Sequence, residues 1–286
     1  MRGLLPVLIH VLSLSLIISQ DYPKKKFYKR EKHAAKIMGR DDRKYGDHSG
    51  NRVLCRFYNH GSIGDQSSSF SGVYPIGSGH SYIWEFSPVV AASVVDTNGF
   101  RRHIVSDGIS GLVDASPEGT PWSFEPLSGY SNPNQENLAM SDNENSWPNS
   151  WPNRTEDWNG EWNGQYGKYI RADQESYFVV DDRYNSEFEF WPDQNDIPED
   201  PTVSPDEHRR GLGIEMEARG YQWNHPAAED IIIVTYWITN VGSSVLDSVV
   251  FGMYGDADIG GASSFSDDDA WFDTENDMVY QWDHDN

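Results

Sequence analysis

The stretch DIIIVTYWITNVGSSVLDSVVFGMY, residues 230–254, decides the fold class. β-Branched and aromatic residues dominate its two apolar runs, which is typical of β-strands. Between the runs, residues 240–244 (NVGSS) supply the asparagine and glycine that favour a turn. We therefore expect a strand over 230–239, apolar on both faces like a central strand, followed by a return strand over 245–254 that pairs with it.

Shorter strand patterns occur throughout the rest of the chain. The expected strands cover residues 52–58, 82–86, 89–95, 101–105, 176–180, 187–191 and 213–222. Residues 101–105 follow the turn sequence DTNG (96–99), and we expect them to pair back across it. Gly and Pro recur, and no helical period survives beyond about two turns. The sequence predicts an all-β, mainly antiparallel protein, a β-sandwich with long irregular loops.

Alternation within 213–222 predicts which side chains share a face. The apolar set comprises Ile214, Met216 and Ala218, and the charged set comprises Glu215, Glu217 and Arg219. A row of charges on one face of a half-buried strand usually faces solvent. We therefore interpret Glu215 and Glu217 as solvent-facing acids and not as a catalytic pair.

The first residues have the pattern of a secretory signal peptide. Met1-Arg2-Gly3 supplies a positive start, an apolar run covers 4–18, and small or polar residues follow. The run is shorter than the roughly 20 apolar residues of a membrane span. We expect a signal peptide at 1–19, a basic linker at 20–48 and a β-rich extracellular region at 49–286. An uncleaved anchor remains the alternative reading of the leader.

The charge of the chain limits its partners. The sequence holds 22 Lys and Arg against 45 Asp and Glu, and from Tyr45 onward the balance is 11 against 41. A surface without basic patches cannot neutralise phosphates, which argues against nucleic acid and anionic membranes as partners. No stretch after the leader is apolar enough to cross a membrane. We expect a secreted or cell-surface protein.

Cys55 is the only cysteine, so the chain cannot form an internal disulfide. An exported protein without disulfides must be stabilised by its core. Val53, Cys55 and Phe57 alternate with polar residues, which predicts a buried Cys55 that behaves as a small hydrophobe.

Residues 114–168 form a long region rich in Trp, Pro, Asn and Ser. Within it, SWPNSWPNRTEDWNGEWNG places four tryptophans close together: Trp147, Trp151, Trp158 and Trp162. Exposed rings of this kind can stack on sugars while Asn and Asp bind the hydroxyls, which makes a carbohydrate site one interpretation. The other is that the rings pack against one another as the internal core of the loop, because aromatic side chains carry large apolar areas. The second interpretation is the simpler one.

An acidic loop follows the return strand. In GDADIGGASSFSDDD, Asp256 and Asp258 stand on alternate residues before two glycines. Carboxylate oxygens at such spacing are typical ligands of Ca²⁺. Three further acids complete the candidate site: Asp267, Asp268 and Asp269. The alternative is a solvated acidic turn, since acids are dense in this part of the chain.

Catalytic signatures are missing from the sequence. No G-x-S-x-G elbow and no H-E-x-x-H motif occur, and the nine histidines show no metal-ligand spacing. We assign no catalytic residue, and we consider an enzyme less well supported than a binding or structural protein.

Several phrases of the sequence suggest a family. The segments NRVLCRFYNHGSIGD, ADQESYFVVDDRYNSEF, RRGLGIEMEARGYQWN and VVFGMYGDADIGG resemble large secreted or surface proteins of Bacteroidetes-like environmental bacteria. The resemblance covers most of the chain after about residue 46. It implies export of the type associated with type IX secretion, and it transfers no catalytic residue.

The sequence thus predicts a non-enzymatic structural or adhesion module that forms the N-terminal part of a larger exported protein. Its expected partners are extracellular glycans or cell-surface components. The alternative is a carbohydrate-binding module or glycan-active enzyme that uses the Trp-rich region. Because the resemblance implies longer proteins, we also expect this sequence to be a fragment.

Overall fold

The computed structural model of the chain describes residues 43–65, 70–95, 99–109, 122–183, 185, 210–242, 245–259 and 267–283. The expected signal peptide, most of the basic linker and the expected strand at 187–191 lie outside these residues. Within them the protein is all-β, and every paired strand is antiparallel. No helix in the described part has the length and hydropathy needed to cross a membrane.

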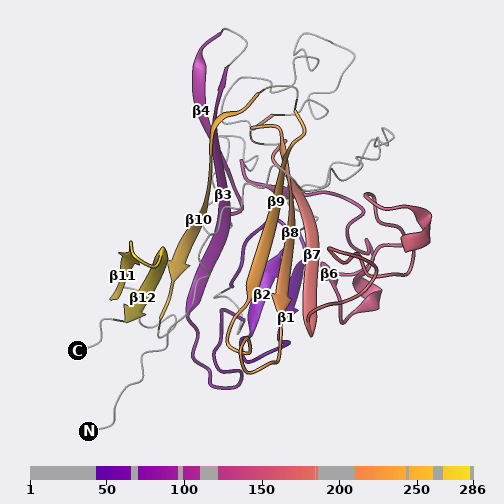
Figure 1. Cartoon of the computed structure of the whole chain (residues 1–286), viewed down its shortest axis with the longest axis vertical. Helices are drawn as coiled ribbons and strands as arrows, with labels where there is room; N and C mark the ends of the chain where they lie inside the picture. Colours follow the sequence, from indigo (N-terminus) through magenta and orange to yellow (C-terminus); the bar gives the residue numbers. More distant parts are fainter. Residues whose placement is uncertain are drawn as a thin grey trace.

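The first sheet is built around one long strand. Its members are β10 (Asp247–Ala257), β3 (Ile83–Val95) and β4 (Arg101–Asp107), in the order β10-β3-β4. The pair β1 (Tyr45–His48) and β2 (Cys55–Tyr58) adjoins this sheet, because Ile63 bridges both Phe57 and Phe86. Figure 1 shows β3 and β10 running side by side along the length of the molecule.

The second sheet has five strands. They are β5 (Glu125–Pro126), β6 (Ala139–Met140), β7 (Gln174–Asp181), β8 (Ile214–Gln222) and β9 (Ile233–Asn240). The order is β5-β7-β8-β9, and β6 also pairs with β7. Two short 3₁₀ helices, η2 (Glu144–Ser146) and η3 (Glu156–Trp158), lie in the Trp-rich region. The hairpin of β11 (Asp268–Asp273) and β12 (Met278–Asp283) forms a separate two-stranded sheet.

The main core lies between the two large sheets, as in a β-sandwich. Val90, Val94 and Ile104 of the first sheet belong to the same apolar cluster as Phe178 and Met216 of the second. Cys55 is completely buried in this cluster, as expected, and burial raises the pKa of its thiol to about 12. Apolar side chains from both sheets thus leave water together, which is the main stabilising term of such a fold.

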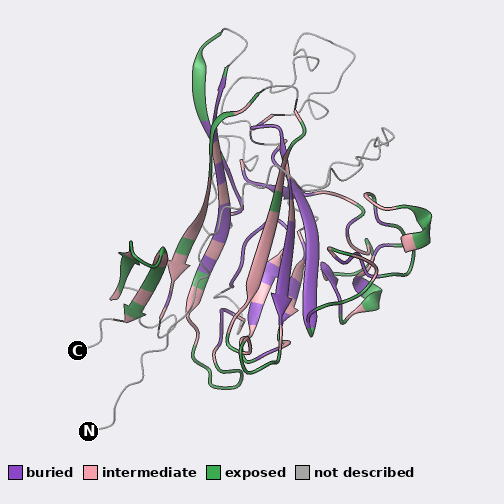
Figure 2. Cartoon of the chain, in the orientation of Figure 1, coloured by how far each residue is buried: buried purple, intermediate pink, exposed green. Residues whose placement is uncertain are grey.

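A second core covers the outer face of β7. Tyr177 and Val179 point into it, whereas Phe178 and Val180 point into the main core, so all eight residues of β7 are buried. The alternation follows from the two-residue period of a strand. In Figure 2 this strand is buried along its whole length. Residues 122–168 carry only short elements, and their aromatic side chains join Tyr177 and Val179 in this second core.

Two predictions about the strands are wrong. Residues 82–86 and 89–95 form one strand, because β3 continues through Pro88 as it pairs with β10 and β4. Strands β9 and β10 do not pair with each other. The chain crosses after Asn240 from the second sheet to the first, so β9 pairs with β8 and β10 pairs with β3. In the described part, β9 is therefore the last strand of its sheet and not a central one.

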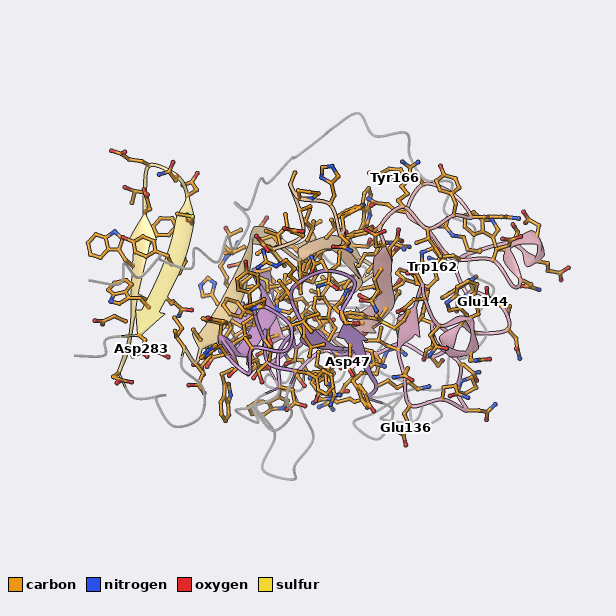
Figure 3. All side chains as sticks on the ribbon, turned by 90° about the horizontal axis from the view of Figure 1, so that it is seen from below. Asp47, Glu136, Glu144, Trp162, Tyr166 and Asp283 are labelled. Atoms are coloured by element: carbon orange, nitrogen blue, oxygen red, sulfur yellow. The ribbon has the colours of Figure 1, made fainter. Side chains whose placement is uncertain are left out.

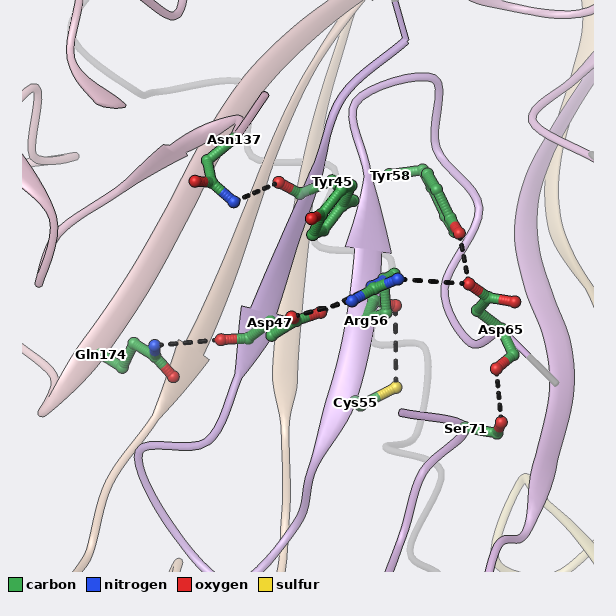
Figure 4. Close-up of polar contacts among 9 residues, drawn as sticks. All are labelled: Tyr45, Asp47, Cys55, Arg56, Tyr58, Asp65, Ser71, Asn137 and Gln174. Atoms are coloured by element: carbon green, nitrogen blue, oxygen red, sulfur yellow. Dashed lines mark hydrogen bonds and ion pairs between the residues drawn. The ribbon is translucent and has the colours of Figure 1, made fainter. Parts of the chain in front are cut away.

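Hydrogen bonds tie the N-terminal strands to distant parts of the chain. The backbone N–H of Gly50 donates to the side-chain oxygens of Gln174 and Gln222, at 2.9 and 2.8 Å. Asn51 donates to the carbonyl oxygen of Ile231 at 2.7 Å. A polar network continues along β1 and β2 with Arg56 at its centre (Figure 4). The amino end of the described chain is thus held by residues up to 180 positions away.

Candidate functional site

The predicted metal residues lie at the junction between the body and the β11–β12 hairpin. Asp256 is the second-last residue of β10, where it pairs with Glu85 of β3. Asp258 follows just after the strand, and its backbone N–H donates to the carbonyl oxygen of Tyr82 at 3.4 Å. Asp268 is the first residue of β11. The backbone of Ile259 connects the two sides, because its N–H donates to Asp268 Oδ2 at 3.1 Å.

Three carboxylate oxygens at this junction are buried without a hydrogen-bond partner. They are Oδ1 and Oδ2 of Asp258 and Oδ1 of Asp268. Only 1% of Asp258 is exposed. Asp256 differs, because its Oδ2 accepts a hydrogen bond from the Tyr254 hydroxyl at 3.1 Å. A buried carboxylate without donors is costly, so this pair is the least satisfied acidic group in the described part of the chain.

The electrostatic environment of the pair is negative. Burial, followed by the carboxylates of Asp268 and Asp256, raises the pKa of Asp258. Burial also raises the pKa of Asp268, where the Ile259 N–H opposes the shift and the carboxylates of Asp283, Asp267 and Asp256 add to it. In both cases the charged form is destabilised, and either a proton or a cation would relieve the repulsion.

The five predicted ligands do not all converge. Asp269 pairs with Trp282 and therefore lies on the opposite face of the hairpin from Asp268, which pairs with Asp283. Asp267 lies close enough to Asp268 to raise its pKa. Within the described residues, no three His, Cys, Asp or Glu side chains are close enough to hold one metal ion between them. The structure therefore places Asp258 and Asp268 at one junction, and the charges of Asp256 and Asp267 act on this pair from nearby.

The four tryptophans of the Trp-rich region are placed mainly in the second core. Trp151 and Trp162 are 3% and 2% exposed, and their rings meet edge to face with centroids 6.0 Å apart. Trp147 packs against Trp162 at 5.4 Å and donates its ring N–H to the carbonyl oxygen of Met140. The Trp162 ring N–H donates to Glu175 Oε2 at 2.7 Å. Trp151 and Trp162 are therefore not accessible for stacking on a sugar ring.

Trp158 is partly exposed, like Trp147, but its ring already has cationic neighbours. The guanidinium of Arg154 lies 4.3 Å from the ring centroid, and the Lys168 ammonium lies 5.5 Å away. Arg154 is held in place by Asn163, which accepts its Nε–H at 2.7 Å. A sugar that stacked on Trp158 would have to displace at least one of these cations.

The β11–β12 hairpin carries an aromatic surface that the sequence reading missed. Trp271 pairs directly with Tyr280, and the Tyr280 and Trp282 rings lie 5.6 Å apart. These three residues share one face of the hairpin, and 60%, 37% and 37% of them are exposed. The sequence contains a signal for this hairpin, because the polar stretch DTEND (273–277) separates Trp271 and Phe272 from Tyr280 and Trp282, which stand at alternate positions. Figure 3 shows that this hairpin, labelled at Asp283, lies far from Trp162.

The buried acids of the second sheet have structural partners. Glu175 accepts the ring N–H of Trp162 and the backbone N–H groups of Arg171 and Ala172. Asp182 accepts three hydrogen bonds, from the backbone of Leu212 and Ile214 and from the Ser106 hydroxyl. Each carboxylate thus fixes a loop or joins two sheets, as a satisfied buried acid does.

The charged face of β8 is only partly solvent-facing. Ile214, Met216 and Ala218 lie in the main core, as predicted. Glu215 and Glu217 are partly exposed, but Arg219 is 5% exposed, because the Trp-rich region covers it. Its guanidinium lies 3.9 Å from the Tyr177 ring centroid and donates to the carbonyl oxygen of Asn163.

Comparisons of the chain with protein-family models, with curated proteins and with solved structures give no match.

Proposed function

We propose that the chain is a non-enzymatic adhesion module of an exported protein and that it contacts its partner through the aromatic face of the β11–β12 hairpin. The observation that carries this proposal is the exposure of Trp271, Tyr280 and Trp282 on one face of a two-stranded sheet. An isolated two-stranded hairpin is marginally stable in water. Three exposed rings on such an element add little to its own packing and form a surface suited to recognition.

The surroundings of this face favour a neutral ligand. Asp269 and Asp273 lie on the same face as the rings, because they alternate with Trp271 along β11. The whole chain has a formal net charge of −23, which disfavours polyanionic partners. Flat rings bordered by carboxylates match the alternating apolar and hydroxyl-rich surfaces of a neutral polysaccharide. We therefore place the carbohydrate-binding alternative on this hairpin instead of on the Trp-rich region.

The non-enzymatic part of the proposal is supported by the roles of the buried acids. Glu175 and Asp182 each accept hydrogen bonds from three donors of the protein itself, which supports a structural role for both carboxylates. Export is supported by the leader pattern at 1–19 and by the resemblance to secreted and surface proteins. Both of these supports come from the sequence.

The experiment is affinity gel electrophoresis of the chain through gels that contain neutral polysaccharides of different backbones. We expect at least one polysaccharide to retard the wild-type chain. The double variant Trp271→Ala with Trp282→Ala should bind that polysaccharide with an affinity at least about tenfold lower. Trp237→Ala is the matched control, because Trp237 is an exposed tryptophan on β9, a strand of the second sheet. Circular dichroism checks that each variant is folded.

Three outcomes would change the proposal. Retardation that disappears on Trp158→Ala and persists in the hairpin variant would assign binding to the Trp-rich region. Release of reducing sugar from the polysaccharides would make the protein an enzyme. No retardation in any gel would contradict glycan adhesion and leave a purely structural role.

A further inference from the structure

We propose that a calcium ion binds at the junction of β10 and β11, between the carboxylates of Asp258 and Asp268, and fixes the hairpin to the body. This inference is independent of what the hairpin binds. It starts from the three buried carboxylate oxygens that have no hydrogen-bond donor, two on Asp258 and one on Asp268. In a folded protein, buried charges are paired with a counter-charge or bound to a metal.

Among the residues that the structure describes, no basic side chain supplies a counter-charge to this pair. Neither Asp256, Asp258 nor Asp268 forms an ion pair with a Lys or Arg of the described residues. The groups that act on the pair electrostatically are other carboxylates. Within the described segments, the Ile259 N–H donates to Asp268 Oδ2, and Oδ1 of Asp268 and both oxygens of Asp258 remain unsatisfied.

A divalent cation with a preference for oxygen fits this chemistry. Ca²⁺ takes six to eight oxygen ligands in a flexible geometry, and it accepts carboxylates, backbone carbonyls and water together. No three acidic side chains of the described residues converge here, so water and backbone oxygens would complete the shell. Mg²⁺ demands near-ideal octahedral geometry and gives up its water reluctantly. Two carboxylates with an open remainder are typical of weak extracellular calcium sites, with dissociation constants of about 0.1 to 1 mM.

The position of the pair explains what the ion would do. Asp258 directly follows β10 of the first sheet, and Asp268 begins the hairpin. Within the described residues, the Ile259–Asp268 hydrogen bond is the contact that joins the two sides at this point. In Figure 1 the hairpin lies beside the end of β10 and outside the two large sheets. A cation bound to both carboxylates would turn mutual repulsion into a cross-link at the base of the hairpin.

The test is a thermal melt of the 286-residue chain in EDTA, in 10 mM Ca²⁺ and in 10 mM Mg²⁺, all at the same ionic strength. With the affinity above, Ca²⁺ is expected to raise the melting temperature by about 3 to 10 °C. Titration calorimetry should give one site per chain. We expect Mg²⁺ to have a clearly smaller effect.

Two variants and one control make the test specific. Asp258→Asn and Asp268→Asn each remove one carboxylate and keep its shape, so both should melt higher than the wild type in EDTA and lose the calcium response. Asn at position 268 can still accept the Ile259 N–H, so at least one folded variant is expected. Glu275→Gln removes one exposed charge from the turn of the same hairpin and should keep the full response.

Opposite results would overturn the proposal. A calcium shift of equal size in the Asp258→Asn variant would mean that the ion only screens the acidic surface. No calcium shift, together with a wild-type stability that rises on acidification and a variant that lacks this rise, would mean that the pair is neutralised by a proton.

Discussion

At the residue scale, the partly buried Arg56 is held by several partners at once. Arg56 donates to both oxygens of Asp47, at 2.7 and 3.0 Å, and reaches Asp65 at 3.5 Å (Figure 4). Its guanidinium also lies 3.9 Å from the Tyr45 ring centroid. The Tyr58 hydroxyl donates to Asp65, and burial, followed by that carboxylate, raises the pKa of Tyr58 to about 12. Removal of one member therefore leaves other charges without a partner.

The Arg56→Met variant tests this network. We expect a loss of about 1 to 3 kcal/mol in the free energy of unfolding, because Asp47 and Asp65 remain half-buried without their cation. The measurement is urea denaturation. The matched control is Arg101→Met, because Arg101 forms an exposed ion pair with Asp247 and should cost at most about 0.5 kcal/mol. Equal losses in the two variants would show that the network adds nothing beyond a surface pair.

The burial of His48 predicts that the free energy of unfolding depends on pH. Its ring is completely buried, its Nε2 lies 2.8 Å from the Ser176 hydroxyl, and burial lowers its pKa to about 3. In the unfolded chain the ring binds a proton below about pH 6.5, whereas in the folded chain it does so only near pH 3. The stability contributed by neutral His48 is therefore complete above pH 6.5 and is lost as the pH falls toward 3.

We expect this loss to reach about 2 kcal/mol at pH 5. Urea denaturation of the wild type and of His48→Gln between pH 7 and 4 measures it, because Gln cannot titrate. The difference between the two free energies of unfolding should shrink as the pH falls. The Asp258 and Asp268 pair has raised pKa values and acts in the opposite direction, but it is common to both proteins. A constant difference across the pH range would contradict a neutral buried His48.

At the element scale, local patterns predicted the strands well and their partners less well. The return of β4 along β3 and the core-facing residues of β8 are confirmed, since a short turn and a two-residue period determine them. The pairing of β9 with β10 is wrong, because a polar turn with Asn240 and Gly242 suits both a hairpin and a crossing between sheets. Which edge a strand joins depends on distant strands such as β3 and β8, which no local pattern encodes.

The second core offers a test of the Trp-rich region as an element of structure. Trp162→Phe should lower the free energy of unfolding by about 2 to 4 kcal/mol, because it leaves a cavity and deprives Glu175 Oε2 of its donor. Trp271→Phe makes the same chemical change on an exposed face and should cost less than about 0.5 kcal/mol. Chemical denaturation compares the two, and a mild effect at Trp162 would refute the second core as a stabilising unit.

At the scale of the whole molecule, the candidate sites were predictable only in part. The acids Asp256, Asp258 and Asp268 are visible in the sequence because they cluster after an apolar strand. The burial of Asp258 is not visible, since it depends on contact with Tyr82 and on the pairing of Asp256 with Glu85, which lie 171 residues apart in the sequence. Likewise, alternation predicts which face of β8 is charged, but not that the Trp-rich region covers Arg219 on this face.

The connections between the two large sheets predict how the molecule unfolds. The chain crosses between the sheets after β9, and β7 contributes to both cores, so the two large sheets should lose their protection together. The β11–β12 hairpin pairs only with itself in the described part and should open at much lower free energy. Amide hydrogen exchange by mass spectrometry measures both. Hairpin amides as protected as those of β7 would contradict this expectation.

The long-range hydrogen bonds of Gly50 also affect how the chain folds while it is being synthesised. Its partner Gln222 lies 172 residues further along the chain. At a synthesis rate of about 5 to 20 residues per second, that partner emerges roughly 10 to 30 s later. During this interval the nascent segment around Cys55 and Phe57 has no sheet to enter, and its apolar side chains stay open to any chaperone that binds extended chains.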